Sequence, residues 1–324
     1  MPKSIDRLST EYLQKIVSVY ISEGEDNALK QFSLSKETFN RYLREARKRG
    51  VSTTDKGKLI SQIIQNYSDK ELEAIAKGGR IVPGYGKVPI ISFEGQRIRI
   101  GAMTDTHLGH IKMPPNRIYQ AFEEFKKEKV DFVVHCGDVT EGMSNRPGQI
   151  YELTHLGYAL QKSLSIEVFG QWTDTEIYAI DGNHDRWFLK SNGAKIVEDI
   201  DAVLPNFNFI GHDEGDISLK GKATLKLWHG EDGNSYALSY RLQKILESLT
   251  GGEKPNAMLC GHTHKYVDIF ERHVMCTSVG AMQSQTAWMR GKRIASHTGF
   301  AIFDYWVNDK GICKKTHTWY PFYS

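Results

Sequence analysis

The sequence predicts an α/β domain preceded by a small all-helical domain. Three observations carry this prediction. Residues 1–79 repeat apolar side chains only at helical spacing, residues 80–89 hold three Gly or Pro turn signals, and from residue 90 short apolar runs alternate with helical stretches. Because such alternation is typical of layered α/β proteins, we expect a helical domain at 1–79, a linker at 80–89 and an α/β domain at 90–324.

The helical domain is expected to hold five helices. The first carries an apolar stripe at helical spacing, made of Leu13, Ile16, Val17 and Tyr20. A short second helix begins near Asp26, and Ser35 is a good N-cap for a third at 36–49, whose last turn is basic. Two more are expected at 58–67 and 69–77.

The α/β domain opens with residues 90–100, whose pattern predicts a hairpin that leads into a buried strand. Four later apolar runs, at 132–134, 177–180, 225–228 and 257–260, predict further buried strands.

Polar residues of metal-binding type follow each of these five strands. In chain order they are Asp105, His107, Asp138, Asn183, His229, His262 and His264. Because the carboxyl ends of strands in α/β sheets line one crevice, we expect these side chains to lie together. Carboxylates with imidazoles suit Mn, Fe or Zn. Seven ligands are too many for one ion and fit two ions that share a carboxylate.

Composition limits the class of protein. Of 324 residues 40% are hydrophobic and 25% are charged, which excludes a disordered or fibrous chain. The four cysteines are far apart, the first residues lack the apolar segment of a secretory signal, and no apolar stretch is long enough to span a membrane. We therefore expect a reduced, cytoplasmic protein with no membrane partner.

The net charge of +3 is unevenly distributed. Residues 1–60 hold 12 Lys or Arg against 8 Asp or Glu, a surplus of +4, whereas the rest of the chain sums to −1. A basic excess of this kind is typical of an element that faces nucleic acid, or of an ordinary solvated helix face.

The five strand ends together resemble the motifs of calcineurin-like metallophosphoesterases. These are Asp-x-His, Gly-Asp-x-x-Glu/Asp, Gly-Asn-His-Asp/Glu, a strand-terminal His and Gly-His-x-His, and all occur in order between Asp105 and His264. The resemblance implies a four-layered α/β/β/α sandwich that hydrolyses phosphoesters with two divalent metal ions. Manganese is expected, with iron, zinc or nickel as alternatives. The resemblance begins near residue 98 and does not include the first 80 residues.

The resemblance also implies a role for each residue. Asp105, His107, Asp138 and His264 would hold one ion, and Asp138, Asn183, His229 and His262 the other, so that Asp138 bridges them. A hydroxide shared by the ions would attack phosphorus in line. His184 would protonate the leaving oxygen or stabilise developing charge, or would only bind the substrate phosphate; Asp185 would orient His184.

Three neighbouring polar residues have less definite roles. His110 is left open between a phosphate contact and a surface or ligand-supporting position. His135 lies in an apolar strand and is expected to be a buried structural histidine. Glu141 would fix a metal ligand or simply begin a helix.

Three features favour a nucleic-acid substrate, and two of them lie in the α/β domain. Arg146 follows Asp138 in a short loop and could pair with a phosphate, unless the loop is only a surface turn. Tyr236 and Arg241 lie around the start of a helix after His229, where a base could stack and a helix N-terminus favours phosphate, although tyrosine at helical spacing is also typical of a core. The basic, aromatic-flanked stretch 288–293 could follow a nucleic-acid backbone.

The third feature is a pattern at residues 28–43 that resembles a helix-turn-helix. In this interpretation Phe39 and Tyr42 pack inward, and Ser33 stands where the motif usually has glycine. The residues that would face the groove are Lys36, Glu37, Asn40, Arg41 and Arg44. A helical oligomerisation module is the alternative.

We therefore predict a two-domain phosphoesterase that hydrolyses phosphodiester bonds in DNA, as a nuclease or DNA-processing enzyme, and that could form a homo-oligomer. One alternative is a small-nucleotide phosphodiesterase or phosphatase whose N-terminal domain serves oligomerisation or regulation. Another is a DNA-binding regulator with an inactive phosphoesterase fold, against which the complete set of ligands argues.

Overall fold

The computed structural model describes residues 8–51, 88–144, 146–231, 235–250, 252 and 254–323. The chain divides into two compact units, Met1–Ile81 and Val82–Ser324. The helices expected at 58–67 and 69–77, and most of the linker expected at 80–89, lie outside the described residues. Within the described ranges, no helix combines the length and the apolar character that crossing a membrane requires.

The first unit contains three described helices, α1 (Thr10–Glu23), α2 (Glu25–Gln31) and α3 (Lys36–Lys48). Ser9 and Ser35 cap α1 and α3, because their side chains accept hydrogen bonds from backbone N–H groups of the first turn. The expected apolar stripes are confirmed. They form one buried core that includes Leu13, Ile16, Val17, Phe39, Tyr42 and Leu43.

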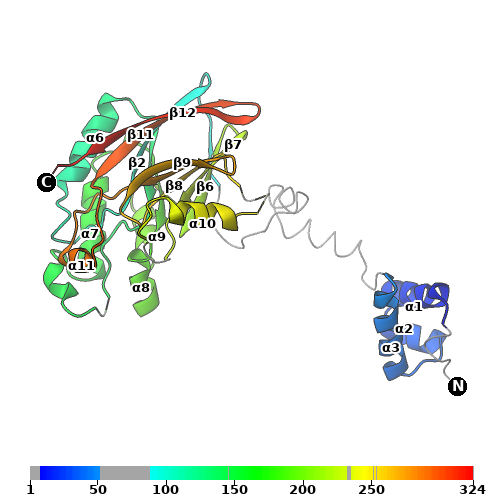
Figure 1. Ribbon diagram of the computed structural model, residues 1–324. Coiled ribbons are helices and arrows are strands. Elements are labelled where there is room, and N and C mark those ends of the chain that lie inside the picture. Colours follow the sequence, from blue (N-terminus) through cyan, green and yellow to red (C-terminus); the bar gives the residue numbers. More distant parts are fainter. Residues whose placement is uncertain are drawn as a thin grey trace. The chain divides into compact units, whose positions relative to one another are not determined.

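The second unit is built on two six-stranded sheets (Figure 1). The first contains β2 (Arg97–Met103), β3 (Phe132–Cys136), β4 (Ile177–Asp181), β5 (Phe207–His212), β11 (Gly299–Asn308) and β12 (Gly311–Pro321). The second contains β1 (Ile90–Ile91), β6 (Glu214–Leu219), β7 (Ala223–Trp228), β8 (Ala257–Cys260), β9 (Tyr266–Glu271) and β10 (Val274–Val279). Their orders are β12-β11-β2-β3-β4-β5 and β1-β6-β7-β8-β10-β9.

Parallel pairing sets the direction of the strands that matter for the site. Strands β2, β3, β4 and β5 are parallel neighbours in the first sheet, and β7, β8 and β10 are parallel neighbours in the second. Parallel neighbours have their carboxyl ends at the same edge of a sheet. The five predicted buried strands all belong to these two groups.

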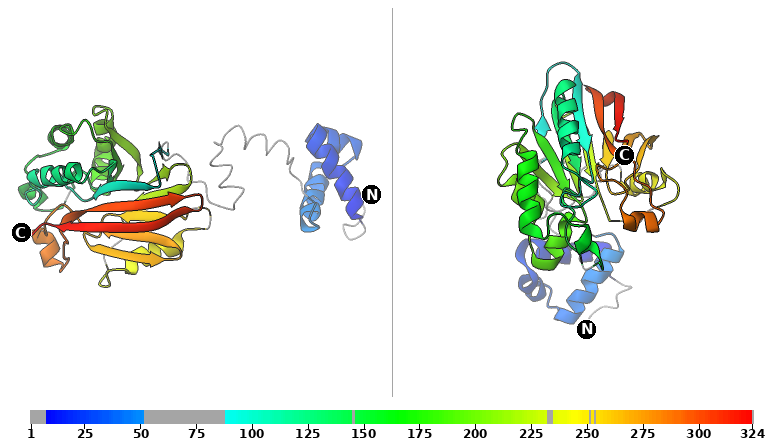
Figure 2. Two further views of the ribbon diagram at one scale, coloured as in Figure 1. Left: turned by 90° about the horizontal axis from the view of Figure 1, so that it is seen from above. Right: turned by 90° about the vertical axis from the view of Figure 1, so that its left-hand side faces the viewer.

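Helices cover the outer faces of both sheets. The helical elements are α6 (Asn116–Lys127), a 3₁₀ helix (Gln149–Glu152), α7 (Tyr158–Phe169), α8 (Asp185–Asn192), α9 (Ile196–Asp201), α10 (Tyr240–Ser248) and α11 (Ala287–Gly291). α6, α7 and α9 share a core with the first sheet, and α10 shares another with the second. A third apolar core fills the space between the sheets. This order of layers, seen in Figure 2, confirms the four-layered α/β/β/α sandwich.

The hairpin expected at 90–100 does not form. Ile90 and Ile91 pair in parallel with β6 of the second sheet, whereas β2 joins the first sheet between β11 and β3. A bend at 94–96, in which Gly95 has a φ of 66°, carries the chain from one sheet to the other. Two strands show the same apolar pattern whether they pair with each other or with strands of different sheets. The periodicity of the sequence therefore could not distinguish a hairpin from the observed arrangement.

Candidate metal centre

The ends of five strands deliver the predicted metal ligands. Asp105 and His107 follow β2, Asp138 follows β3, Asn183 follows β4, His229 follows β7, and His262 and His264 follow β8. Three of these strands belong to the first sheet and two to the second. The ligands therefore gather where the carboxyl ends of parallel strands from both sheets meet.

The backbone at this edge is strained. Five of the predicted ligands have a positive φ: Asp105 (52°), His107 (42°), Asp138 (52°), His262 (71°) and His264 (55°). For a residue other than glycine this left-handed conformation costs of order 1–3 kcal/mol and is concentrated at functional sites. The surrounding sheets thus hold these side chains in positions that an unconstrained chain would avoid.

Asp105, His107 and His264 form one cluster of potential ligands. His264 Nε2 lies 3.0 Å from Asp105 Oδ1 and 3.2 Å from His107 Nε2. His107 Nε2 lies 3.7 Å from Asp105 Oδ1. All three side chains are buried, and each offers an atom within 4.8 Å of the others. This cluster has the chemistry and the spacing of a site for one ion.

Asp138, His229 and His262 form a second cluster, which Asn183 joins. His229 Nε2 lies 3.1 Å from Asp138 Oδ2 and 3.2 Å from Asn183 Oδ1. Asn183 Oδ1 lies 2.9 Å from His262 Nδ1. His229 Nδ1 donates to the carbonyl oxygen of Cys136 at 2.7 Å, which fixes the ring so that Nε2 faces the cluster.

Asp138 connects the two clusters. Its Oδ2 is 3.1 Å from His229 Nε2 in the second cluster and 3.7 Å from His107 Nε2 in the first. Its Oδ1 accepts a hydrogen bond of 2.8 Å from the backbone N–H of His184. Carboxylate, amide and imidazole groups without thiolate fit divalent ions such as manganese, iron or zinc. The residues present therefore fit two ions that share Asp138.

The sequence of residues 98–266, more than half of the chain, matches the family of calcineurin-like phosphoesterases. The chain belongs to this family. The resemblance drawn from the five motifs is thereby confirmed, and the protein is a metal-dependent phosphoesterase.

Three solved structures illustrate what the phosphoesterase is similar to. One is a novel archaeal phosphodiesterase, at 19% identity and a TM-score of 0.41, covering 69% of this chain and 100% of that chain. Another is Yfce, a phosphoesterase from E. coli, at 18% identity and a TM-score of 0.40, covering 68% of this chain and 98% of that chain. The third is Vacuolar Protein Sorting 29 from Cryptosporidium parvum, at 13% identity and a TM-score of 0.37, covering 71% of this chain and 100% of that chain. No curated protein matches the sequence significantly. The family assignment depends on residues 98–266 and not on these likenesses.

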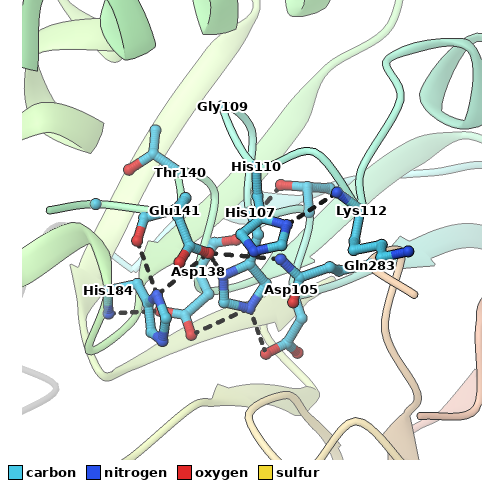
Figure 3. A network of polar contacts seen from close by, with 12 residues as sticks. Asp105, His107, Gly109, His110, Lys112, Asp138, Thr140, Glu141, His184 and Gln283 are labelled. Atoms are coloured by element: carbon cyan, nitrogen blue, oxygen red, sulfur yellow. Dashed lines mark hydrogen bonds and ion pairs between the residues drawn. The ribbon is translucent and has the colours of Figure 1, made fainter. Parts of the chain in front are cut away.

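Glu141 holds one ligand of the phosphoesterase in place (Figure 3). Its Oε2 lies 3.0 Å from His107 Nδ1, which leaves His107 Nε2 for the first cluster. Gln149 Nε2 donates to Glu141 Oε1 at 3.0 Å, and Gln283 Nε2 donates to Oε2 at 3.4 Å. Burial raises the pKa of Glu141, but the charge of His184 and the hydrogen bond from His107 outweigh burial and hold it well below its usual value. Of the two roles considered for Glu141, the contacts favour fixing a ligand.

His184 lies beside the ligands and lines a cavity that opens next to them. Its Nδ1 donates to the carbonyl oxygen of Glu141 at 2.8 Å, and its ring centroid lies 4.5 Å from that of His107. With Nδ1 used by Glu141, Nε2 is the nitrogen that can give a proton to a substrate or bind its phosphate. Both roles for His184 stay predictions.

Asp185 does not orient His184, so the role predicted for Asp185 is corrected. Its carboxylate accepts hydrogen bonds of 2.8–3.0 Å from three backbone N–H groups, two of them in the loop after β3, and one of 2.7 Å from the Thr140 hydroxyl. Burial, with the charge of Asp138, raises the pKa of Asp185 to about 6. Asp185 therefore fixes the loop that carries Asp138, and the carbonyl of Glu141 fixes His184 instead.

Two further histidines, His110 and His135, are buried in the second unit. His135 is fully buried, and its Nε2 lies 2.9 Å from the Thr106 hydroxyl, as expected for a structural residue. Burial lowers the pKa of His135 to about 3, so it stays neutral. His110 is also buried, and its Nδ1 accepts a hydrogen bond of 2.9 Å from the backbone of Lys112. Since His110 does not line the cavity, the contacts favour a supporting position over a phosphate contact.

A cavity of about 380 Å³ opens beside the ligands. Arg146 lines it, as predicted for a residue that contacts substrate. Arg146 Nη2 binds Glu152 Oε2 at 2.6 Å, and its guanidinium carbon lies 5.7 Å from the ring centroid of Trp288. The guanidinium is therefore held in position, and its contact with a substrate phosphate stays a prediction.

Tyr236 and Arg241 do not line this cavity. Tyr236 is fully exposed, and the preceding residues 232–234 lie outside the described ranges. Arg241 is only 4% exposed, because it lies on the buried face of α10 with Leu242 and Ile245. Contact of either residue with a substrate stays a prediction that this cavity does not support.

In the first unit, α3 exposes the residues predicted to face DNA. Asn40, Arg41 and Arg44 are all exposed. Lys36 is exposed as well, and its Nζ lies 3.1 Å from Glu25 Oε1. Glu37 is exposed too, and DNA contact by these five residues stays a prediction.

Several supporting residues were not predicted. Gln161 accepts a hydrogen bond of 2.8 Å from Gly142 N and donates one of 3.0 Å to Gly142 O, which holds the loop after Glu141. Trp187 packs on His184, with ring centroids 3.8 Å apart. The spacing of three residues between His184 and Trp187 was the one available signal, because residues three apart share a helix face. No local pattern marks Gln161.

Proposed function

We propose that this phosphoesterase hydrolyses phosphodiester bonds in DNA, as a nuclease or DNA-processing enzyme. The observation that carries the proposal is the exposed basic surface of α3 in a unit separate from the metal centre. Exposed Arg and Lys side chains on one helix are the usual means of neutralising DNA phosphates.

The metal centre supports hydrolysis of a diester. Two divalent ions, when bound, supply Lewis acidity that activates water and stabilises charge on the phosphoryl oxygens. Asp138 would hold both ions, and Glu141 keeps His107 in the orientation that ligation needs. His184 would give a proton from Nε2 to the leaving oxygen, since its Nδ1 is already used by the Glu141 carbonyl. We expect manganese as the metal.

The geometry of the first unit supports a helix-turn-helix-like role. Ser33, between α2 and α3, has a φ of 49°, so it takes the left-handed conformation that the motif usually assigns to glycine. Phe39 and Tyr42 are buried on one side of α3, while Arg41 and Arg44 are exposed. The buried side fixes the helix, and the exposed side is free for a phosphate backbone or a groove.

The first experiment offers the manganese-loaded protein labelled single-stranded and double-stranded DNA, beside a cyclic nucleotide and a phosphopeptide. We expect cleavage of DNA and loss of cleavage with a chelator. Cleavage of the cyclic nucleotide or the phosphopeptide without cleavage of DNA would contradict the proposal.

The second experiment tests the α3 surface. Arg41→Ala with Arg44→Ala should weaken duplex binding and reduce the slope of log Kobs against log salt by roughly 2, because about 0.9 is lost for each phosphate contact. Lys15→Ala with Lys30→Ala is the matched control, because it removes two exposed positive charges from α1 and α2. Equal salt slopes in the two double variants would refute the assignment of α3. A shift from oligomer to monomer in the α3 variant would favour the oligomerisation module.

A further inference from the structure

The cavity beside the metal ligands has an aromatic and apolar part that the hydrolytic chemistry does not use. Trp187, Trp288, Met289 and Ile294 line it, together with polar ligands such as His264. Trp288 is 47% exposed. A half-exposed indole in the wall of a substrate cavity is suited to contact with a planar group, because it offers a large apolar face without much conformational freedom.

Trp187 brings this aromatic surface next to the reacting groups. Its ring packs against His184 with a centroid distance of 3.8 Å and an interplanar angle of 33°. His184 offers a ring nitrogen within 4.8 Å of ligand atoms on His107 and Asp138. A substituent on a phosphate held at the metal centre would therefore lie close to an indole.

Trp288 is positioned before any substrate binds. The Thr286 side chain accepts a hydrogen bond of 3.1 Å from Met289 N and so caps the short helix that carries Trp288. The segment leading to it is tied to the first ligand cluster, because Gln283 N donates to the carbonyl oxygen of Asp105 at 3.1 Å. Binding a planar group here would cost little ordering of the protein.

Charge near Trp288 also fits one class of ligand. The Arg146 guanidinium carbon lies 5.7 Å from the ring centroid of Trp288. Arg290, Lys292 and Arg293 follow Trp288 in the chain, and all three are exposed. An aromatic surface flanked by positive charge is suited to a ligand with planar rings joined by phosphates, which describes a nucleotide chain.

We propose that Trp288, supported by Trp187, forms a subsite that stacks the nucleobase attached to the scissile phosphodiester. Every base offers a π face, so the subsite would select nucleoside diesters over diesters without a base and would not select among bases. The inference rests on the phosphodiesterase activity proposed above and names its substrate class.

The test compares two diesters with the same leaving group. One is the p-nitrophenyl ester of thymidine 5′-monophosphate, and the other is methyl p-nitrophenyl phosphate, which has no base. The measured quantity is kcat/KM for the thymidine diester divided by kcat/KM for the methyl diester, with the manganese-loaded full chain. In Trp288→Ala and Trp288→Leu this ratio should fall roughly 5- to 150-fold, the range expected for losing one base–aromatic stack. Trp288→Phe should stay within about threefold of wild type.

Phe270→Ala is the matched control. Phe270 is 66% exposed on β9 and does not line the cavity, so its loss should leave the ratio unchanged. If the ratio in Trp288→Leu equals that of Phe270→Ala, the subsite is refuted. A fall of equal size for both diesters in Trp288→Leu, which leaves the ratio unchanged, would refute it as well.

A binding readout separates this inference from the proposed function. Thymidine 5′-monophosphate should quench the tryptophan fluorescence of wild type more than of Trp288→Phe, whereas inorganic phosphate should not distinguish them. Equal quenching by the nucleotide in both proteins overturns the subsite. Selective quenching without cleavage of DNA supports the subsite and contradicts the DNA proposal.

Discussion

Replacement of Gly182 by alanine should disable the metal centre, although Gly182 is not itself a ligand. A Cβ at this position would lie 2.2 Å from Asp138 Oδ1, 2.5 Å from Asp138 N and 2.7 Å from His229 Nε2. Ordinary contact begins near 3.4 Å, so Asp138 would have to move by more than 1 Å. The neighbouring atoms belong to Asp138, predicted to bridge the ions, and to His229 of the second cluster, so the added Cβ would displace predicted ligands.

The size of the effect follows from this displacement. Metal–ligand distances tolerate about 0.2 Å, and a misplacement of about 1 Å in a catalytic constellation costs about 100-fold in rate. We therefore expect Gly182→Ala to lower kcat/KM for bis(p-nitrophenyl) phosphate by at least about 100-fold. Manganese content, measured by mass spectrometry after gel filtration, should fall below that of wild type. Overpacking should also destabilise the unit by roughly 1–3 kcal/mol.

Gly291→Ala is the control for this substitution. A Cβ at Gly291 would meet nothing within 4 Å, and Gly291 is exposed, so activity and metal content should match wild type. Wild-type metal content together with turnover within threefold of wild type in Gly182→Ala would refute the reasoning. Such a result would mean that the ligand clusters can shift without loss of function.

Three other perturbations test separate parts of the molecule. Glu141→Gln should weaken manganese binding 10- to 100-fold, because His107 loses the carboxylate that orients it; titration of the metal-free protein measures this, and unchanged affinity would contradict it. The hydrogen bond with Asp181 raises the pKa of His212 against the effect of burial, so its stabilisation is complete below pH ~6.5 and is lost as pH rises through the raised value. The melting temperature of His212→Gln should therefore fall furthest below wild type near pH 6, and a deficit independent of pH would exclude this linkage. Phe39→Ala removes a fully buried ring from the first unit and should destabilise it by about 3–5 kcal/mol, as seen by faster hydrogen exchange at 10–48, while turnover of the chromogenic diester stays within twofold. A parallel loss of turnover would show that the units are not independent.

The gathering of the metal ligands could be predicted because each one follows an apolar strand. The apolar composition of the runs before Asp105, Asp138 and His229 is typical of buried strands. Parallel strands have their carboxyl ends at one edge of the sheet. The local sequence before each ligand is therefore enough to predict that the ligands lie together. The left-handed backbone at Asp105 and Asp138 could not be predicted, because the sheets impose it and glycine does not mark it.

Roles that depend on side-chain direction could not be read from neighbours in the chain. Asp185 is adjacent to His184, which made a pair of them plausible. As the first residue of α8, Asp185 instead directs its carboxylate to backbone N–H groups after β3. The partner of His184 is Glu141, 43 positions away. Only the packing of the loop after β3 against the start of α8 decides between these partners.

The aromatic part of the cavity could not be predicted from the sequence either. Trp187 and Trp288 are separated by about a hundred residues, and neither belongs to a motif of the metal centre. Trp288 reaches the cavity because the preceding segment hydrogen-bonds to the backbone at Asp105. The residues around Trp288 in the sequence do not show that it lines the cavity. Its position there depends on a hydrogen bond between Asp105 and Gln283, which are 178 positions apart.

The charge of the metal centre differs from what the sequence count indicates. Residues beyond 60 sum to −1 with histidine taken as neutral. Burial lowers the pKa of His229, but the charge of Asp138 outweighs burial and raises it to about 9, so without metal this ring carries a proton. Ligation needs the neutral ring, and metal binding therefore replaces protons with ions. Two divalent ions would bring four positive charges against the three carboxylates of Asp105, Asp138 and Glu141. A nearly neutral unit would then present a positive centre to the negative charge of a phosphoester.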